Sequence, residues 1–188
     1  MHIKNIKLII LLLVYNSNIN INYMGAGILP VAIYRGSIYI LLGQERFSGQ
    51  WSDFGGGALP NEKRDRYTTA IREGSEELNG LFGVSCELRD TVKDNLLMTI
   101  SNTDDRYTSY VYKVDYDKML PVYFDRQNKF IETHLNDKIY QDNGLFEKSQ
   151  IRWFKHSELV NKKTRPNIRN FYECIIDKVV KSDKLLLK

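Results

Sequence analysis

The chain has few cysteines, no long apolar segment and no repeated sequence. Its 188 residues include two cysteines, Cys86 and Cys174, which lie far apart and outside any CxxC or CxxH context. We therefore expect buried free thiols and no disulfide framework of the secretory kind. With no internal repeat, low-complexity tract or second domain in view, the length predicts one domain with a substantial core.

The longest apolar run, Leu8 to Val14, is too short for a membrane helix, which needs about 20 apolar residues. No stable membrane span is expected. Basic residues before the run resemble a signal peptide, but no small-residue cleavage site follows. A leader, an edge strand and a functional start at Met24 are the alternatives for residues 1–23. We expect residues 24–188 to form the domain and the product to be cytoplasmic, with a signal-like or anchoring N-terminus as the alternative.

No Ser-His-Asp or Cys-His grouping of nucleophilic catalysis can be assembled from the sequence. The formal net charge of +4 is mild; it suits an anionic substrate but does not by itself indicate nucleic acid. Oligomeric state is not specified by any pattern in the chain.

The most informative stretch runs from Gly55 to Gly80 and reads GGGALPNEKRDRYTTAIREGSEELNG. Residues three and four apart share a helix face, so Glu73, Glu76 and Glu77 project carboxylates from one side. A hard divalent cation such as Mg²⁺ would offset their repulsion, whereas a solvated acidic face is the alternative. The glycines favour the ion site, because they let backbone groups approach a metal or an anion closely.

This stretch resembles the signature box of the Nudix hydrolases, G-x5-E-x7-R-E-U-x-E-E-x-G-U, in which U is a bulky aliphatic residue. Five residues separate Gly56 from Glu62, and nine separate Glu62 from Arg72. Every charged position of the box is present and in order. The remaining acids of the box are Glu73, Glu76 and Glu77.

The chain departs from the box at three places. Two extra residues lie between Glu62 and Arg72, Gly74 replaces an aliphatic residue, and Asn79-Gly80 replaces Gly-aliphatic. Gly74 costs its helix up to about 1 kcal/mol relative to Ala, and either leaves a gap or lets another element approach closely. None of the departures removes a metal ligand.

The resemblance implies an α/β fold, an α/β/α sandwich with a mixed central sheet. It also implies hydrolysis of a pyrophosphate linkage in a nucleoside diphosphate joined to another group, with Mg²⁺ or Mn²⁺ as cofactor. Hydrolysis of the mRNA cap is an alternative within this class. A non-catalytic nucleotide-binding module is an alternative from another class, but such modules usually lose box carboxylates, and this chain keeps them.

By the same resemblance, Glu76 and Glu77 are the principal metal ligands, with the backbone carbonyl of Gly55 or Gly56 as another. Glu73 is a further ligand or the group that orients and deprotonates water. The expected oxygen ligands are those that divalent ions prefer.

Three positions ahead of or within the box are candidate substrate-binding residues. Arg46 is a candidate phosphate contact, with Trp51 beside it in the turn before the box and Gly56 in the glycine loop. A surface arginine beside a packing tryptophan is the alternative. Arg72 is expected to pair with Glu62 and so to lock the loop onto the helix.

Family members often use one more acid outside the box, on a loop before a late strand. Glu147, ahead of Trp153, occupies a similar place in this chain. Glu132 and Asp142 are its rivals for the role of base or ligand.

Periodicity predicts five strands and three main helices. The strands are 25–34, 37–43, 96–100, 107–114 and 151–154, and the helices are 65–79, 124–135 and 168–180. Pro30 predicts a bulge or an edge position in the first strand. Ser157 is expected to cap a short helical turn.

Two basic segments could hold an RNA backbone, although a solvated face is the favoured alternative. They consist of Lys63, Arg64 and Arg66, and of Lys162, Lys163, Arg165 and Arg169.

Overall fold

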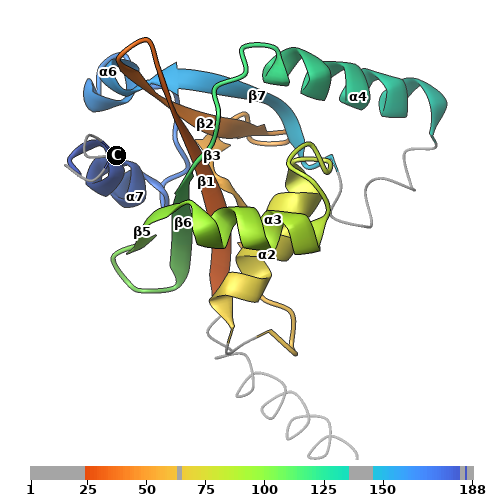
Figure 1. The fold of residues 1–188 in the computed structure, drawn as a ribbon, viewed down its shortest axis with the longest axis horizontal. Coiled ribbons are helices and arrows are strands. Elements are labelled where there is room, and N and C mark those ends of the chain that lie inside the picture. The colour runs from red at the N-terminus through yellow and green to blue at the C-terminus, as the bar shows by residue number, and fades with distance from the viewer. Residues whose placement is uncertain (1–23, 63–64, 136–145, 183–184, 186–188) are drawn as a thin grey trace, which may run out of the picture.

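The computed structural model describes residues 24–62, 65–135, 146–182 and 185. In these residues a seven-stranded mixed sheet runs in the order β3-β2-β1-β6-β5, with β4 on β1 and β7 on β2 (Figure 1). The strands are β1 (Gly25–Tyr34), β2 (Ser37–Glu45), β3 (Trp51–Ser52), β4 (Phe54–Gly57), β5 (Leu96–Ser101), β6 (Tyr107–Lys113) and β7 (Lys148–Lys155). The helices are α2 (Arg66–Glu77), α3 (Ser85–Asp94), α4 (Leu120–His134), α6 (His156–Val160) and α7 (Glu173–Val180).

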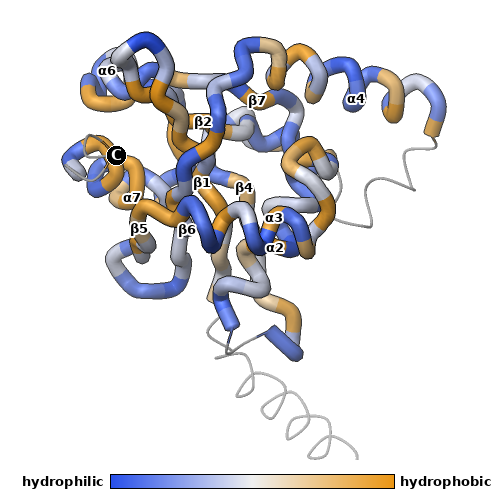
Figure 2. Tube along the Cα trace, viewed as in Figure 1, coloured by the Kyte–Doolittle hydropathy of each residue, from blue (hydrophilic) through white to orange (hydrophobic). Residues whose placement is uncertain are grey.

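Helices cover both faces of the sheet, as Figures 1 and 2 show. One apolar cluster lies between the sheet and α6 with α7, and includes Leu29, Leu42, Phe154, Leu159 and Ile176. The other lies under α2, α3 and α4, and includes Ile28, Phe54, Ile71, Leu88 and Phe124. Successive residues of a strand point to opposite faces, which is how Ile28 and Leu29 enter different clusters. The expected α/β/α sandwich with a mixed sheet is confirmed.

Strand β1 is the branch point of the sheet, and it corrects the expectation for Pro30. Residues 25–28 pair antiparallel with β4, residues 31–34 pair antiparallel with β2, and β6 runs parallel along the other side. Pro30 lies between Ile28 and Val31, where the neighbouring strand changes. The strand is interior rather than an edge. Pro30 is opposite Tyr112 of β6, but it has no ladder partner on the β4 and β2 side, where the missing N–H of proline is tolerated.

The helix expectations need three further corrections. Helix α3 was not predicted, because Leu88 and Val92 are its only buried residues and most of its other positions are polar. Helix α4 begins at Leu120, four positions before the expected start, with a proline in its first turn. The residue at the N-cap of α6 is Lys155, so Ser157 lies inside the helix instead of capping it.

The last helix is shorter than its apolar pattern. Ile168 forms a bridge with Trp51 beside β3, and Trp51 N–H donates to the carbonyl of Asn167 at 2.8 Å. Helix α7 starts only at Glu173. The apolar residues before it are buried by packing against the sheet, which gives the same hydrophobic spacing without a continuous helix.

Candidate active site

Helix α2 carries the box, and its ends are set by local chemistry. The Asp65 carboxylate accepts a hydrogen bond from Thr68 N–H at 3.0 Å, which confirms the expected N-cap. Beyond the C-terminal end, Asn79 and Gly80 have φ values of 52° and 72°. Asparagine and glycine tolerate this left-handed conformation better than other residues, so the Asn-Gly pair ends the helix without altering the site.

Gly74 brings α2 directly against the sheet. A Cβ atom at this position would lie 2.4 Å from Cδ1 of Ile28 in β1. The absence of a side chain therefore permits a close approach of the helix to β1. This contact explains why the chain has glycine where the box has an aliphatic residue.

The glycines of β4 lie against the acids of α2. Gly55 N–H donates to Oε2 of Glu77 at 2.7 Å. A Cβ atom on Gly56 would lie 2.6 Å from the carboxylate carbon of Glu73. Only backbone without side chains fits between these acids and the strand, so carboxylates and backbone groups share one small region.

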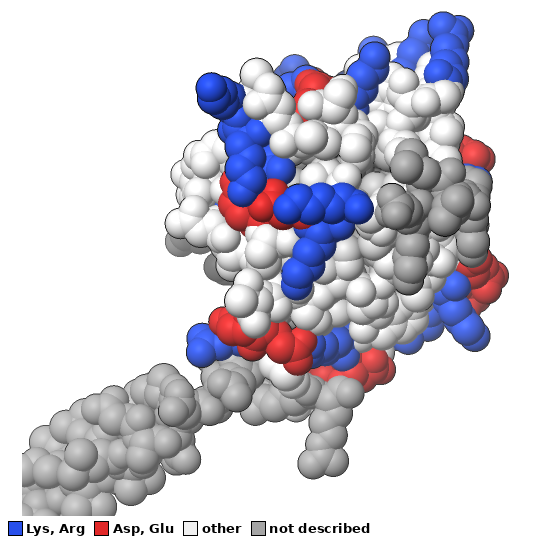
Figure 3. All heavy atoms as spheres, turned by 90° about the vertical axis from the view of Figure 1, so that its left-hand side faces the viewer, with Lys and Arg blue, Asp and Glu red and all other residues white. Residues whose placement is uncertain are grey.

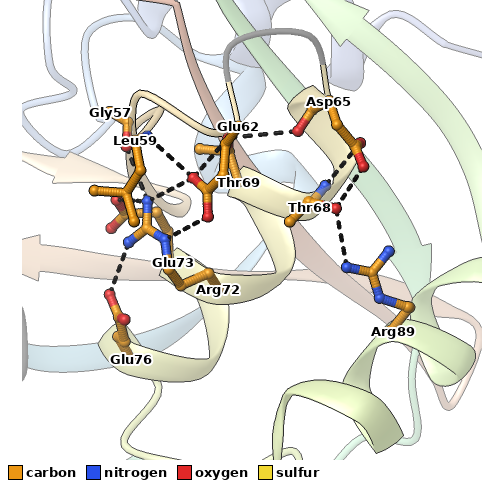
Figure 4. A network of polar contacts seen from close by, with 10 residues as sticks. All are labelled: Gly57, Leu59, Glu62, Asp65, Thr68, Thr69, Arg72, Glu73, Glu76 and Arg89. Atoms are coloured by element: carbon orange, nitrogen blue, oxygen red, sulfur yellow. Dashed lines mark hydrogen bonds and ion pairs between the residues drawn. The ribbon is translucent and has the colours of Figure 1, made fainter.

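Arg72 joins three acids into an outer cluster, defined as Arg72, Glu62, Glu73 and Glu76 (Figure 4). Its guanidinium lies 2.9 Å from Glu62, 2.8 Å from Glu73 and 3.0 Å from Glu76. It also donates to the carbonyl of Gly57 at 2.9 Å. Burial alone would lower the pKa of Arg72, but Glu62 and Glu73 raise it above its ordinary value. The expected Arg72–Glu62 pair is present despite the two extra residues in the loop.

A second cation forms an inner cluster, defined as Lys148, Glu45, Ser52 and Glu77. The Nζ atom of Lys148 lies 2.5 Å from Glu45 Oε1, 3.0 Å from Ser52 Oγ and 3.3 Å from Glu77 Oε2. The Lys148 side chain is 0% exposed and that of Glu77 is 2% exposed. Burial raises the pKa of Glu77 to about 8, against the opposing effect of Lys148.

Glu147 lies close enough to the box acids to change their ionisation. Burial and then the charges of Glu76 and Glu147 raise the pKa of Glu73. Burial and the charge of Glu45 likewise raise the pKa of Glu147. Of the three acids considered outside the box, Glu132 instead pairs with Arg46 at 2.5 Å. Asp142 lies outside the described residues.

The carboxylates of α2 are divided between two cations. In the part of the chain that the structure describes, no three His, Cys, Asp or Glu side chains converge as an ion site does. The chemistry of the groups still suits a hard divalent cation, because carboxylates that raise one another's pKa stand beside glycine backbone. Both Glu73 and Glu76 are paired with Arg72.

The three expected substrate-binding residues, Arg46, Trp51 and Gly56, have different surroundings. Besides pairing with Glu132, Arg46 donates from Nε to the carbonyl of Phe146 at 2.9 Å. Trp51 is 8% exposed and packs edge-on against Phe154 with 4.9 Å between ring centroids. Trp51 therefore has the surroundings of a packing residue, whereas Gly56 lines a cavity.

That cavity has a volume of about 460 Å³ and borders the glycines of β4. Two arginines line it, Arg106 and Arg169, together with the aromatic residues Tyr107 and Phe171. The Arg169 guanidinium stacks over the Phe171 ring at 4.7 Å. The volume is within the usual range for small-molecule sites. The lining offers an aromatic surface and two arginines, which pair with Asp104 at 3.2 Å and with Glu45 at 2.9 Å.

Sequence reasoning missed the inner cluster and the buried Asp53. Burial raises the pKa of Asp53 to about 6, although Ser109 and Tyr107 donate hydrogen bonds to it. Gly43, a glycine inside β2, is a sequence feature that could have indicated the inner cluster. A Cβ atom there would lie 2.9 Å from Cδ of Lys148, so this glycine makes room for the lysine.

No protein-family model and no curated protein matches the sequence. Solved structures do match. The chain resembles the Nudix hydrolases in motif and in fold. A Caenorhabditis elegans Ap4A hydrolase complex matches with 17% identity and a TM-score of 0.49, covering 82% of this chain and 94% of that one.

Two further solved structures match. A Francisella tularensis bifunctional NMN adenylyltransferase/ADP-ribose pyrophosphatase, with AMP and manganese, matches with 14% identity and a TM-score of 0.47 over 84% of this chain and 41% of that one. The NUDIX domain of Shewanella oneidensis NrtR with ADP-ribose matches with 11% identity and a TM-score of 0.44 over 84% and 85%. These are likenesses of fold.

Proposed function

We propose that this protein is a metal-dependent hydrolase of pyrophosphate linkages in nucleoside-diphosphate-type substrates. One observation carries the proposal: the box carboxylates of α2 lie against the glycine backbone of β4, next to a cavity lined by two arginines. Acids suit the ion, and arginines with an aromatic ring suit a nucleotide.

Glu73, Glu76 and Glu77 are the proposed ligands of Mg²⁺ or Mn²⁺, with a backbone carbonyl of Gly55 or Gly56. When bound, the ion supplies charge neutralisation of the pyrophosphate and acidifies the attacking water. Glu77 has Oε2 bound by Gly55 and Lys148, which leaves Oε1 as its ligand atom.

The remaining side chains would prepare the site for attack. Arg72 holds Glu76 at 3.0 Å, and Glu76 would have to leave it to become a metal ligand, while the bonds of Arg72 to Glu62 would keep the loop on the helix. Glu147, exposed and electrostatically coupled to the box acids, is proposed to accept the proton of the attacking water. Glu73 is the second candidate for that proton.

The cavity beside β4 is the proposed place of the nucleotide. Arg106 and Arg169 would bind anionic groups, and Phe171 would stack on the base. Arg46 remains a proposed phosphate contact, for which it must exchange its bond to Glu132. Trp51 is buried, so we do not expect it to contact the nucleotide.

RNA is not favoured as substrate, because three of the four basic residues of the second segment lie within ion-pair distance of acids, so this surface is not uniformly basic. The pairs are Lys162–Asp177 at 2.8 Å, Arg165–Glu173 at 2.7 Å and Arg169–Glu45 at 2.9 Å. Figure 3 shows Lys and Arg mixed with Asp and Glu on the α7 side. In the first segment Arg66 pairs with Asp105 at 2.8 Å, and Lys63 and Arg64 lie outside the described residues.

We further propose a cytoplasmic location. Within the described residues, none of the helices has the length and apolarity that a membrane crossing requires.

The test is a substrate panel with Mg²⁺ or Mn²⁺. It comprises nucleoside diphosphate derivatives, nucleoside triphosphates, dinucleoside polyphosphates and capped RNA, with Glu77→Gln as the blank. We expect metal-dependent release of a nucleoside monophosphate or diphosphate from at least one small nucleotide. Binding without turnover would support the non-catalytic module, and cleavage of capped RNA alone would support decapping. Equal turnover by the Glu77→Gln variant would rule out this site.

A further inference from the structure

The ammonium group of Lys148 occupies a place built from oxygen atoms. It is fully buried, and Glu45 Oε1, Ser52 Oγ and Glu77 Oε2 all lie within 3.3 Å of it. Glu45 is also paired with Arg169 at 2.9 Å, from the side of the cavity. Two carboxylates and a hydroxyl are oxygen donors of the kind that also bind divalent cations.

The backbone around Lys148 is held in place. Asn128 Nδ2 donates to the carbonyls of Lys148 and Ser149 at 3.0 and 3.2 Å, which ties the start of β7 to α4. Gly43 leaves the space through which the lysine stem passes. Residues of three elements, β2, β7 and α4, therefore hold the ammonium in this position.

Stability alone does not account for a lysine at this position. Lysine is almost never fully buried unless it is paired, as Lys148 is, and a buried ion pair is often no more stable than apolar residues of the same volume. The inner cluster shares Glu77 with the proposed metal site, and this shared residue suggests a functional reason for the buried charge.

We propose that the ammonium of Lys148 takes the place of one divalent ion beside Glu77. This inference rests on the proposed function: Glu77 binds the built-in cation through Oε2 and the catalytic metal through Oε1. Lys148 is a positioning residue in this arrangement, because it acts through Glu77 and not on the substrate. The native chain is then expected to take up one divalent ion fewer than a chain without the ammonium.

The test counts Mn²⁺ ions bound per chain, with Mn²⁺ alone as the probe and free ion followed by electron paramagnetic resonance. Lys148→Ala empties the place and should bind one ion more than the native chain. The matched control is the double variant Glu45→Gln/Lys148→Ala, which lacks one of the oxygen ligands. It should lose the additional ion, or bind it at least about tenfold more weakly, the scale on which supporting groups affect metal affinity.

Lys148→Met repeats the count with most of the buried volume kept. A Lys148→Ala chain that is unfolded without metal but recovers its circular dichroism spectrum in Mn²⁺ supports the inference equally. Failure of both single variants to take up an additional ion, or to fold in saturating Mn²⁺, overturns it.

The outcomes separate this inference from the proposed function. A native chain that hydrolyses nucleotides, with variants that bind the same number of ions, refutes the role of Lys148 alone. An additional ion in Lys148→Ala beside an inactive native chain supports the role of Lys148 and refutes the hydrolase.

Discussion

The outer and inner charge clusters each place one cation among several oxygens, but in different surroundings. In the outer cluster Arg72 is bound by Glu62, Glu73 and Glu76, and its side chain is 23% exposed. In the inner cluster Lys148 is bound by oxygens of three residues and is 0% exposed. In each, one cation is bound by several oxygens, but the outer cation is partly exposed to water and the inner cation is fully buried.

This difference decides which acids can change partners. A partly exposed ion pair is worth about 0–1 kcal/mol, so Glu76 can leave Arg72 at small cost. A buried pair cannot open without leaving a desolvated charge, which costs about 3–5 kcal/mol. The outer cluster is therefore suited to exchange an arginine for a metal, and the inner cluster is suited to stay fixed.

The sharpest test of this contrast compares Lys148→Met with Arg72→Met in metal-free buffer. Lys148→Met should lower the free energy of unfolding by about 3–5 kcal/mol, because it leaves the ionised Glu45 without its buried cation and removes the donor to Ser52 and Glu77. Arg72→Met should cost about 1–3 kcal/mol, chiefly because the mostly buried Glu62 loses its cation and keeps only the hydrogen bonds from Leu59 and Thr69. Urea unfolding measures both values, and equal losses would show that burial does not distinguish the clusters.

The outer cluster should respond in activity rather than stability. Glu76→Gln should lower turnover at least about a hundredfold, the scale of losing one group that stabilises the transition state. Its free energy of unfolding should change by no more than about 0.5 kcal/mol, because Glu76 is partly exposed. Turnover with Mg²⁺ and urea unfolding are measured on the same preparations.

The matched control is Asp90→Asn, which removes an exposed acid from α3. It should leave both quantities unchanged. A Glu76→Gln variant with native turnover would remove Glu76 from the ligand set.

The outer cluster was predictable because its residues belong to one local pattern. Helix periodicity places Glu73 and Glu76 on one face, and the Asp65 cap and the Asn79 stop fix the ends of that helix. The Arg72–Glu62 pair was expected from the resemblance of the sequence to the box. Short-range rules of helix geometry were sufficient here.

The inner cluster was not predictable because it depends on strand pairing. Lys148 meets Glu45 only because β7 pairs antiparallel with β2, and the register shifts between Gln44 and Glu45. Asp53 reaches Tyr107 across Gly27 of β1, because β4 and β6 both pair with β1. Such contacts join residues distant in sequence, and a single strand pattern does not specify its partner or its register.

Acidity offers a further test of the inner cluster. Burial raises the pKa of Glu77 from 4.5 to about 8, so the folded chain holds a proton that the unfolded chain releases. This stabilisation is full below pH 4.5 and is lost as the pH rises through 8. Asp53 acts in the same direction but only up to about pH 6. Between pH 4.5 and 8 the free energy of unfolding should fall by up to about 1.4 kcal/mol per pH unit.

Urea unfolding of the native chain and of Glu77→Gln at several pH values between 6 and 8 measures this slope. The glutamine variant should show a flatter dependence, because its amide does not titrate. The same slope in both chains would mean that Glu77 is ionised throughout this range.

The smallest expected effect lies at the start of α2, away from both cations. Asp65→Ala removes the hydrogen bond to Thr68 N–H and should cost about 1 kcal/mol of stability. Turnover at saturating Mg²⁺ should stay within about twofold of native, because Glu62 and not the cap holds Arg72 in place. Asp65→Asn should restore most of the lost stability, since asparagine caps nearly as well as aspartate. If Asp65→Ala lost turnover as strongly as Glu76→Gln, the outer cluster would depend on the whole helix start, and its exchange of partners would not be a local event.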